Sequence, residues 1–146
     1  TLDLYLLGDQ NEISRLTRLE NDSNLNISIK KPIPFNLIIK KLNSYDLGIF
    51  YIEPTTFNLK HSLPNKFFEF IMARLGVIVS PIVDMAELID EYNVGLYPEK
   101  FDLVELACLL NKLTVDDINK FKIASHKASR MLCFEKEVQE LGTIFV

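Results

Sequence analysis

The chain has 146 residues and a formal net charge of −4, and 48% of its residues are hydrophobic. This length fits one domain with a sizeable core. An acidic chain without a dense basic segment argues against a nucleic-acid partner. Because we find neither a signal peptide nor an apolar run of about twenty residues, we expect a chain that is not exported and does not itself span a membrane. It does not begin with Met, and we expect it to be part of a longer protein.

Short apolar segments alternate with amphipathic segments along almost the whole chain. The predicted strands cover residues 4–7, 25–29, 47–52, 77–79 and 96–97. The predicted helices cover residues 10–19, 35–42, 64–75, 85–92, 103–113, 115–128 and 134–145. Asp9 with Glu12, and Thr114 before its helix, are typical of N-terminal caps.

This order of elements predicts the α/β class. We expect a doubly wound parallel sheet in three α/β/α layers, forming a single Rossmann-like domain over residues 1–146. In such sheets ligands bind beyond the carboxyl ends of the strands. The corresponding loops cover residues 8–9, 30–34, 51–63 and 80–84.

The most informative segment covers residues 61–80, with the sequence H-S-L-P-N-K-F-F-E-F-I-M-A-R-L-G-V-I-V-S. Pro64 is typical of a first helical turn, and Gly76 is typical of a helix end. The free amides of a helix N-terminus favour an anion, most often phosphate. Lys66 adds positive charge, and Glu69 places a carboxylate within reach of neighbouring hydroxyls. These features predict a sugar-nucleotide site, although their spacing alone fits a solvated helix surface about equally well.

The segment S-L-P-N-K-F-F-E-F-x-x-A-x-x-G-V-I-V-S resembles the donor-binding motif of GT-B glycosyltransferases, specifically the retaining group 1 or family 4 type that builds bacterial surface polysaccharides. Five further segments resemble the C-terminal domain of that family in the right order: L-Y-L-L-G-D, I-S-I-K-K-P-I-P, S-Y-D-L-G-I-F, P-I-V-D-M-A-E-L-I and Y-N-V-G-L-Y. The resemblance implies the donor-nucleotide-binding domain of such an enzyme. The first strand of that domain and the N-terminal acceptor domain are absent from the chain.

The resemblance also implies the roles of individual residues in a donor site. Glu69 accepts hydrogen bonds from the ribose hydroxyls. The residues around the diphosphate and the donor sugar, largely through their backbone, are His61, Ser62, Leu63, Pro64, Asn65 and Lys66. Lys31, Pro32 and Ile33 face the base, and Gly8 is a further binding residue at the end of a strand. No catalytic residue is assigned, and neither a metal nor another cofactor is expected.

The chain departs from the family pattern at two positions of this segment. The family usually has a glutamate eight positions before the one that matches Glu69, and His61 stands there instead. His61 is either a contact to the donor sugar or a polar loop residue. Arg74 stands where many relatives have Gly or Pro, as either a solvated helix residue or a contact to the absent domain.

Several other residues with reactive side chains have ordinary structural explanations. We expect Cys108 and Cys133 to be buried free thiols, because both fall in helical patterns without a C-x-x-C motif. The acidic pair at 116–117 lies in a first helical turn, where it complements the helix dipole rather than binding a metal. His126 lies in a Lys- and Ser-rich helix without a visible partner.

The expected activity is retaining transfer of a hexosyl group from a nucleotide sugar to a glycan or lipid-linked acceptor. The acceptor would bind through the missing N-terminal domain, so the isolated chain is expected to be inactive. The expected location is the cytoplasm, either free or in peripheral association with the inner face of the membrane. Two alternatives remain open: a non-catalytic nucleotide-binding or assembly domain of the same fold, and a sugar-nucleotide epimerase.

Overall fold

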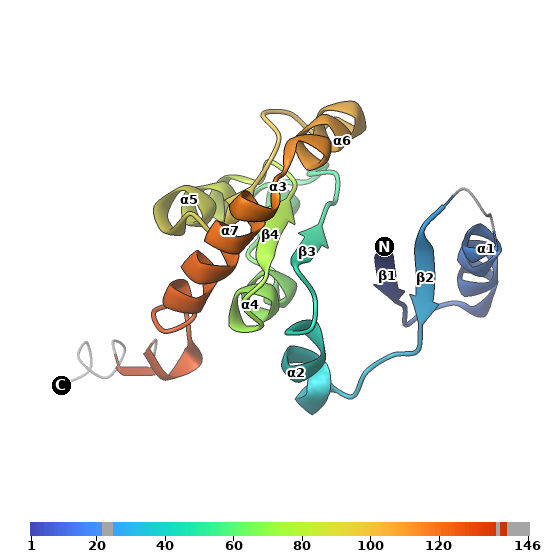
Figure 1. The fold of residues 1–146 in the computed structure, drawn as a ribbon, viewed down its shortest axis with the longest axis horizontal. Coiled ribbons are helices and arrows are strands. Elements are labelled where there is room, and N and C mark those ends of the chain that lie inside the picture. Colours follow the sequence, from blue (N-terminus) through green and yellow to red (C-terminus); the bar gives the residue numbers. More distant parts are fainter. Residues whose placement is uncertain (22–24, 137, 140–146) are drawn as a thin grey trace. The chain divides into compact units, whose positions relative to one another are not determined.

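A computed structural model describes the whole chain except residues 22–24, 137 and 140–146 (Figure 1). The chain divides into two compact units, Thr1–Ile38 and Ile39–Val146. Both units combine helices with parallel strands, so the α/β class is confirmed. The assignment of a single domain stays a prediction.

The first unit contains a two-stranded parallel sheet formed by β1 (Leu2–Tyr5) and β2 (Ile27–Lys30). The two strands are joined by α1 (Gln10–Glu20) (Figure 1). Asp9 accepts hydrogen bonds from two amides in the first turn of α1, so its predicted role as the N-terminal cap is confirmed. The Glu12 carboxylate, the expected second half of a capping box, accepts from Arg15. The short 3₁₀ helix η1 (Phe35–Leu37) follows β2 and leads into the next helix.

β1 ends two residues before the predicted strand does. Tyr5, the last residue of β1, pairs with Lys30, the last residue of β2. In the same register Leu7 would pair with Pro32, which has no amide N–H for a sheet hydrogen bond. The side chain of Leu7 is instead 90% exposed. The proline that ends β2 therefore also limits the length of β1.

The second unit contains a three-stranded parallel sheet in the order β3–β4–β5. Its strands are β3 (Leu47–Phe50), β4 (Gly76–Val79) and β5 (Gly95–Leu96). The helices that begin at or after the unit boundary are α2 (Ile38–Leu42), α3 (Phe57–Lys60), α4 (Asn65–Met72), α5 (Val83–Tyr92), α6 (Leu103–Lys112) and α7 (Val115–Ala128).

The core of the second unit surrounds β4, whose four residues are all buried. α4 and α7 contact β4 and each other. Apolar residues recur at helical spacing along α4 and the turn after it. Phe67, Ile71 and Leu75 of this set are fully buried, whereas Phe68 and Met72 are half-buried. Phe70 is also buried. A continuous apolar strand covered by helices is typical of parallel sheets.

α4 ends before the predicted stop at Gly76, because Arg74 takes the left-handed conformation with φ of 62°. The amide of Leu75 donates to the carbonyl of Phe70, and the amide of Arg74 donates to the carbonyl of Ile71. This pair of bonds is the Schellman motif, in which the left-handed position is usually glycine. Gly76 instead begins β4. The prediction that Gly76 ends the helix was therefore wrong.

The five predicted strands are present and parallel, but they form two sheets rather than one. Each sheet follows chain order with helical connections, as in βαβ units. The single doubly wound sheet in three layers stays a prediction. The one-turn helix α3 was missed in the loop at 53–63, where Thr56 caps it by accepting from the amide of Leu59.

Two smaller expectations concern the last third of the chain. Cys108 is exposed and Cys133 is half-buried, and both thiols are free. The prediction that both are buried was therefore wrong. Cys108 lies in α6, which has no buried residue, and Cys133 lies beyond the end of α7. The predicted helix over 134–145 falls partly outside the described residues. Within the described part of the chain, no helix is long and apolar enough to cross a membrane.

Candidate functional site

Two helices begin at the carboxyl edge of the three-stranded sheet without a side-chain cap. The residues before α4 and α5 are Pro64 and Ile82. Neither side chain accepts a hydrogen bond from the first-turn amides. Elsewhere in this unit, Asp102 caps α6 and Thr114 caps α7. First-turn amides have no partner within their own helix. The two uncapped helix starts therefore offer amides to an outside acceptor at the edge where parallel sheets bind ligands.

Lys66 and Glu69 lie on one face of the first turns of α4 and form an ion pair. Lys66 Nζ donates to Glu69 Oε2 at 2.7 Å. The Lys66 side chain is 52% exposed, whereas the Glu69 side chain is 15% exposed. The Glu69 carboxylate is thus held in place, whereas the Lys66 ammonium group can move into solvent. The ion pair places the predicted cation and the predicted hydroxyl acceptor beside the uncapped helix start.

His61 contacts two side chains that the sequence did not connect with it. Its Nδ1 lies 3.4 Å from Asp84 Oδ1, in the first turn of α5. Its ring lies 4.8 Å from the ring of Phe57 in α3, centroid to centroid. His61 thereby links the loop before α4 to the start of α5. Asp84 lies in the strand-end loop predicted at 80–84, but nothing in the sequence pairs it with His61.

The remaining predicted residues of this loop connect α3 to α4. Ser62 donates from its hydroxyl to the carbonyl of Leu59, so the side chain is engaged within the loop. The Leu63 side chain is 43% exposed. Pro64 precedes the first residue of α4, Asn65, whose side chain is exposed. The structure therefore brings His61, Ser62, Leu63, Pro64, Asn65, Lys66 and Glu69 together at the N-terminus of α4.

The other predicted residues lie in the first unit. Gly8 follows β1, and Lys31, Pro32 and Ile33 follow β2. Because β1 and β2 are parallel neighbours, these four residues lie beyond the carboxyl ends of one sheet. Gly8, Lys31 and Pro32 are exposed, and Ile33 is half-buried. An added Cβ at Gly8 would meet no atom within 4 Å, so this position has room beside it.

Two hydroxyl side chains hold the edge of the three-stranded sheet. Ser80 is fully buried, donates to the carbonyl of Ile52 and accepts from the amide of Ile52, both at 2.6 Å. Tyr51 stacks on Phe101 and shares two hydrogen bonds with the backbone of Asp102. Burial raises the pKa of Tyr51 above its ordinary value. Both hydroxyls have partners, so they stabilise the edge rather than wait for a ligand.

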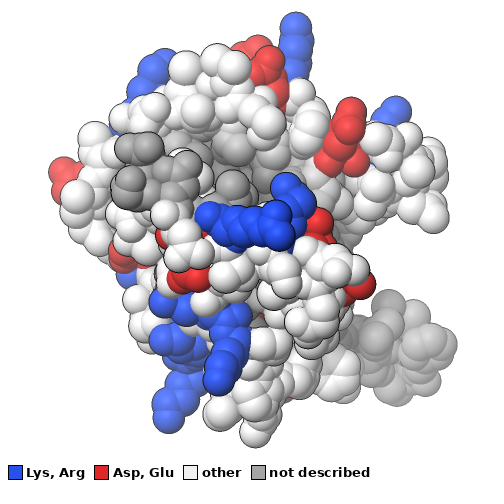
Figure 2. All heavy atoms as spheres, turned by 90° about the vertical axis from the view of Figure 1, so that its right-hand side faces the viewer, with Lys and Arg blue, Asp and Glu red and all other residues white. Residues whose placement is uncertain are grey.

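Basic and acidic side chains are interspersed on the face drawn in Figure 2. This pattern agrees with the small net charge of −4. Among the described residues, no group of three or more His, Cys, Asp or Glu side chains is arranged to hold a metal ion. Asp116 and Asp117 lie in the first turn of α7, where Asp117 completes a capping box with Thr114.

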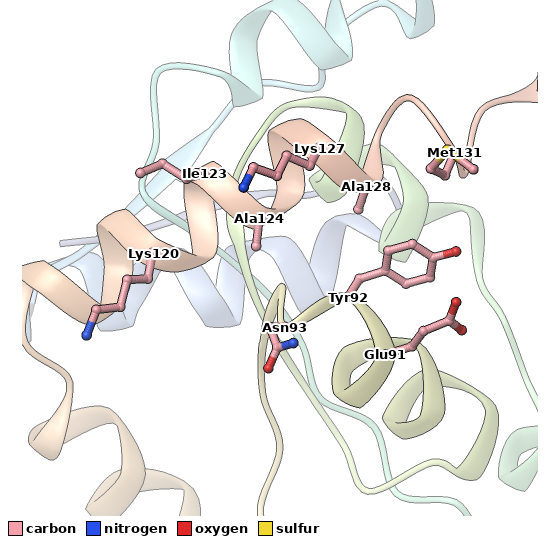
Figure 3. Close-up of a pocket in the computed structure, with 9 residues that line it drawn as sticks. All are labelled: Glu91, Tyr92, Asn93, Lys120, Ile123, Ala124, Lys127, Ala128 and Met131. Carbon is pink, nitrogen blue, oxygen red and sulfur yellow. The ribbon is translucent and has the colours of Figure 1, made fainter.

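Two open cavities lie elsewhere in the second unit, beside α7. The larger, of about 580 Å³, is lined by Asn43, Arg74, Asn119, Lys122, Ile123 and His126. The other, of about 510 Å³, lies between α7 and the end of α5 (Figure 3). None of the predicted donor-site residues lines either cavity. These cavities are therefore separate from the edge that carries Glu69.

No protein-family model matches this chain, and no curated protein matches its sequence. The function is therefore inferred from the residues and contacts described above.

Proposed function

We propose that this chain is the donor-binding half of a retaining glycosyltransferase that uses a nucleotide sugar. The observation that carries the proposal is the uncapped start of α4, with the Lys66–Glu69 pair beside it. The resemblance of residues 62–80 to a donor-binding motif assigns this same helix start to the donor.

The diphosphate would lie at the first-turn amides of α4, where the helix dipole favours negative charge. Lys66 would leave Glu69 Oε2 and turn to a phosphate oxygen. This exchange is cheap, because an exposed ion pair contributes only about 0–1 kcal/mol. Glu69 would then accept from the ribose hydroxyls. His61, oriented by Asp84, would face the donor sugar.

The strand pairings fit the proposed fold. A doubly wound dinucleotide-type sheet has the strand order 3-2-1-4-5-6. If β1 and β2 are strands 2 and 3, and β3, β4 and β5 are strands 4, 5 and 6, the pairings β1–β2 and β3–β4–β5 both agree with that order. Each sheet by itself therefore agrees with one part of the doubly wound order.

Catalysis would consist of stabilising the departing nucleoside diphosphate. Helix-start amides and a lysine supply fixed positive charge where the leaving group develops negative charge. The acceptor and the other wall of the cleft belong to the N-terminal domain, so transfer requires closure of two domains. The isolated chain would bind a nucleotide without turning it over.

Calorimetric titration with UDP, GDP, ADP and CMP tests the proposal. We expect one nucleotide to bind selectively, with Glu69→Ala losing about 1–2 kcal/mol of binding free energy from a lost hydrogen bond. Glu87→Ala is the matched control, because it removes an exposed carboxylate from α5. An equal loss in both variants would contradict a specific role for Glu69.

A product assay on the full-length protein separates the alternatives. Glycosyl transfer to an acceptor identifies the transferase, and interconversion of sugar nucleotides without an acceptor identifies an epimerase. Selective nucleotide binding without either reaction would identify a non-catalytic binding domain.

A further inference from the structure

His126 lies between two arginines that come from different parts of the second unit. Arg74, at the end of α4, donates from Nε to His126 Nδ1 at 2.8 Å. Arg130, just after α7, places Nη2 3.3 Å from His126 Nε2. His126 itself lies in the last turn of α7. The expectation that this histidine has no partner was therefore wrong, and both of its ring nitrogens face a guanidinium group.

The ring cannot accept hydrogen bonds from both arginines. A neutral imidazole has one acceptor nitrogen and one N–H. With Nδ1 accepting from Arg74, the proton lies on Nε2, so this N–H faces the N–H groups of Arg130. In the opposite tautomer the proton lies on Nδ1, and this N–H faces the Nε–H of Arg74. In either tautomer two N–H donors face each other at about one hydrogen-bond distance, which is too short for an oxygen atom to lie between them. An oxyanion would accept from both donors only from beside the pair, after the arginine side chain turns outward.

Within the described part of the chain, neither Arg74 nor Arg130 forms a salt bridge with an acidic residue. Lys122, which lines the same cavity, pairs with Asp46 at 2.9 Å. The C-terminal end of α7 supplies about half a negative charge, which is less than the charge of two guanidinium groups. The cluster therefore keeps a net positive charge.

We propose that Arg74, His126 and Arg130 form a binding site for a phosphate group. Guanidinium groups bind phosphate through paired N–H donors. The open cavity of about 580 Å³ is lined by Arg74 and His126, and Arg130 contacts His126 from outside that lining. Arg74 precedes β4, whereas His61 contacts the helix that follows β4. The site thus lies at the amino end of β4, opposite the proposed donor site. It does not depend on the proposed donor site.

The test is an NMR titration with inorganic phosphate and with pyrophosphate. We expect shifts at the His126 ring and at the amides of Arg74 and Arg130. Arg130→Gln should weaken binding by about tenfold or more, a factor that corresponds to one hydrogen bond to a charged group. His126→Gln removes the ring N–H and should also weaken binding. Lys127→Gln is the matched control, because Lys127 is also on the last turn of α7 but lines the other cavity (Figure 3). We expect it to change binding by less than about twofold.

A second arm identifies the source of the phosphate group. Vesicles of phosphatidylcholine are compared with vesicles that also contain about 30% phosphatidylglycerol. Binding only to the anionic vesicles, lost in Arg130→Gln and kept in Lys127→Gln, supports the site with a lipid headgroup as its ligand. Thermal unfolding of each variant checks that the fold is retained. Equal weakening in Lys127→Gln, or no response to phosphate, pyrophosphate or anionic vesicles, would overturn the proposal.

Discussion

Gly48 lets the ring of Phe70 lie directly on β3, and this contact sets the distance between α4 and the sheet. A Cβ at Gly48 would lie 2.5 Å from Cδ2 and 2.6 Å from Cδ1 of that ring. Phe70 is only 9% exposed, so its ring has little free space to enter. We expect Gly48→Ala to cost about 1–3 kcal/mol through overpacking. Alanine also loses less backbone entropy than glycine, by about 0.5–1 kcal/mol, so we expect a net loss of stability of about 1 kcal/mol.

Urea denaturation followed by far-UV circular dichroism measures this loss. Gly8→Ala is the matched control, because its Cβ meets nothing within 4 Å, and it should leave stability unchanged or slightly raised. Phe70→Leu removes ring atoms from the contact, so the double variant should lose less than the sum of the single losses, by about 0.5 kcal/mol or more. A Gly48→Ala protein as stable as the wild type, or a loss that does not depend on residue 70, would refute the reasoning.

Three further predictions concern helix ends and the sheet edge. Arg74→Gly should raise stability by about 0.5–1 kcal/mol in a His126→Ala background, where the hydrogen bond from Arg74 is already lost, because φ of 62° strains a side-chain-bearing residue. A lower melting temperature in that background would contradict this. The hydrogen bond from Thr114 holds the pKa of Asp117 below its ordinary value of 3.8. The ionised Asp117 carboxylate therefore stabilises the fold above pH 3.8, and this stabilisation is lost as the pH falls below 3.8. Asp117→Asn should make the free energy of unfolding less dependent on pH below 3.8. An unchanged pH dependence would argue against the capping role of Asp117. Ser80→Ala should cost about 1–3 kcal/mol in urea denaturation, because it leaves the amide and carbonyl of Ile52 without their partner; a neutral result would show that water replaces the hydroxyl.

The sequence predicts the elements well where local signals agree with burial. Pro64 and the apolar spacing of Phe67, Ile71 and Leu75 place α4 within a residue of its observed start. The capping residues Asp9 and Thr114 act as their spacing predicts. In these segments the turn chemistry, the helical period and the tertiary packing all favour the same structure.

Other features depend on contacts between distant residues, which no local pattern encodes. Asn93 takes the left-handed conformation that ends α5, whereas Gly95 begins β5. Gly95 is needed because an added Cβ would strike the carbonyl group of Val77 in the neighbouring strand. The contacts of His61 with Asp84 and of Arg74 with His126 likewise join residues 23 and 52 positions apart. Their residue types were visible in the sequence, but their partners were not.

The central claim is that the start of α4 binds the diphosphate of a nucleotide. The most direct measurement follows the backbone amide signals of Asn65 and Lys66 by NMR, while the preferred nucleoside diphosphate and its parent nucleoside are added separately. We predict that the diphosphate shifts both amides with a dissociation constant of about 1 mM or below, and that the nucleoside without phosphate does not. Glu69→Ala should weaken this response by about 5–30-fold. If the diphosphate leaves both amides unchanged, or if the nucleoside shifts them equally, the helix start is not a phosphate site and the account is wrong.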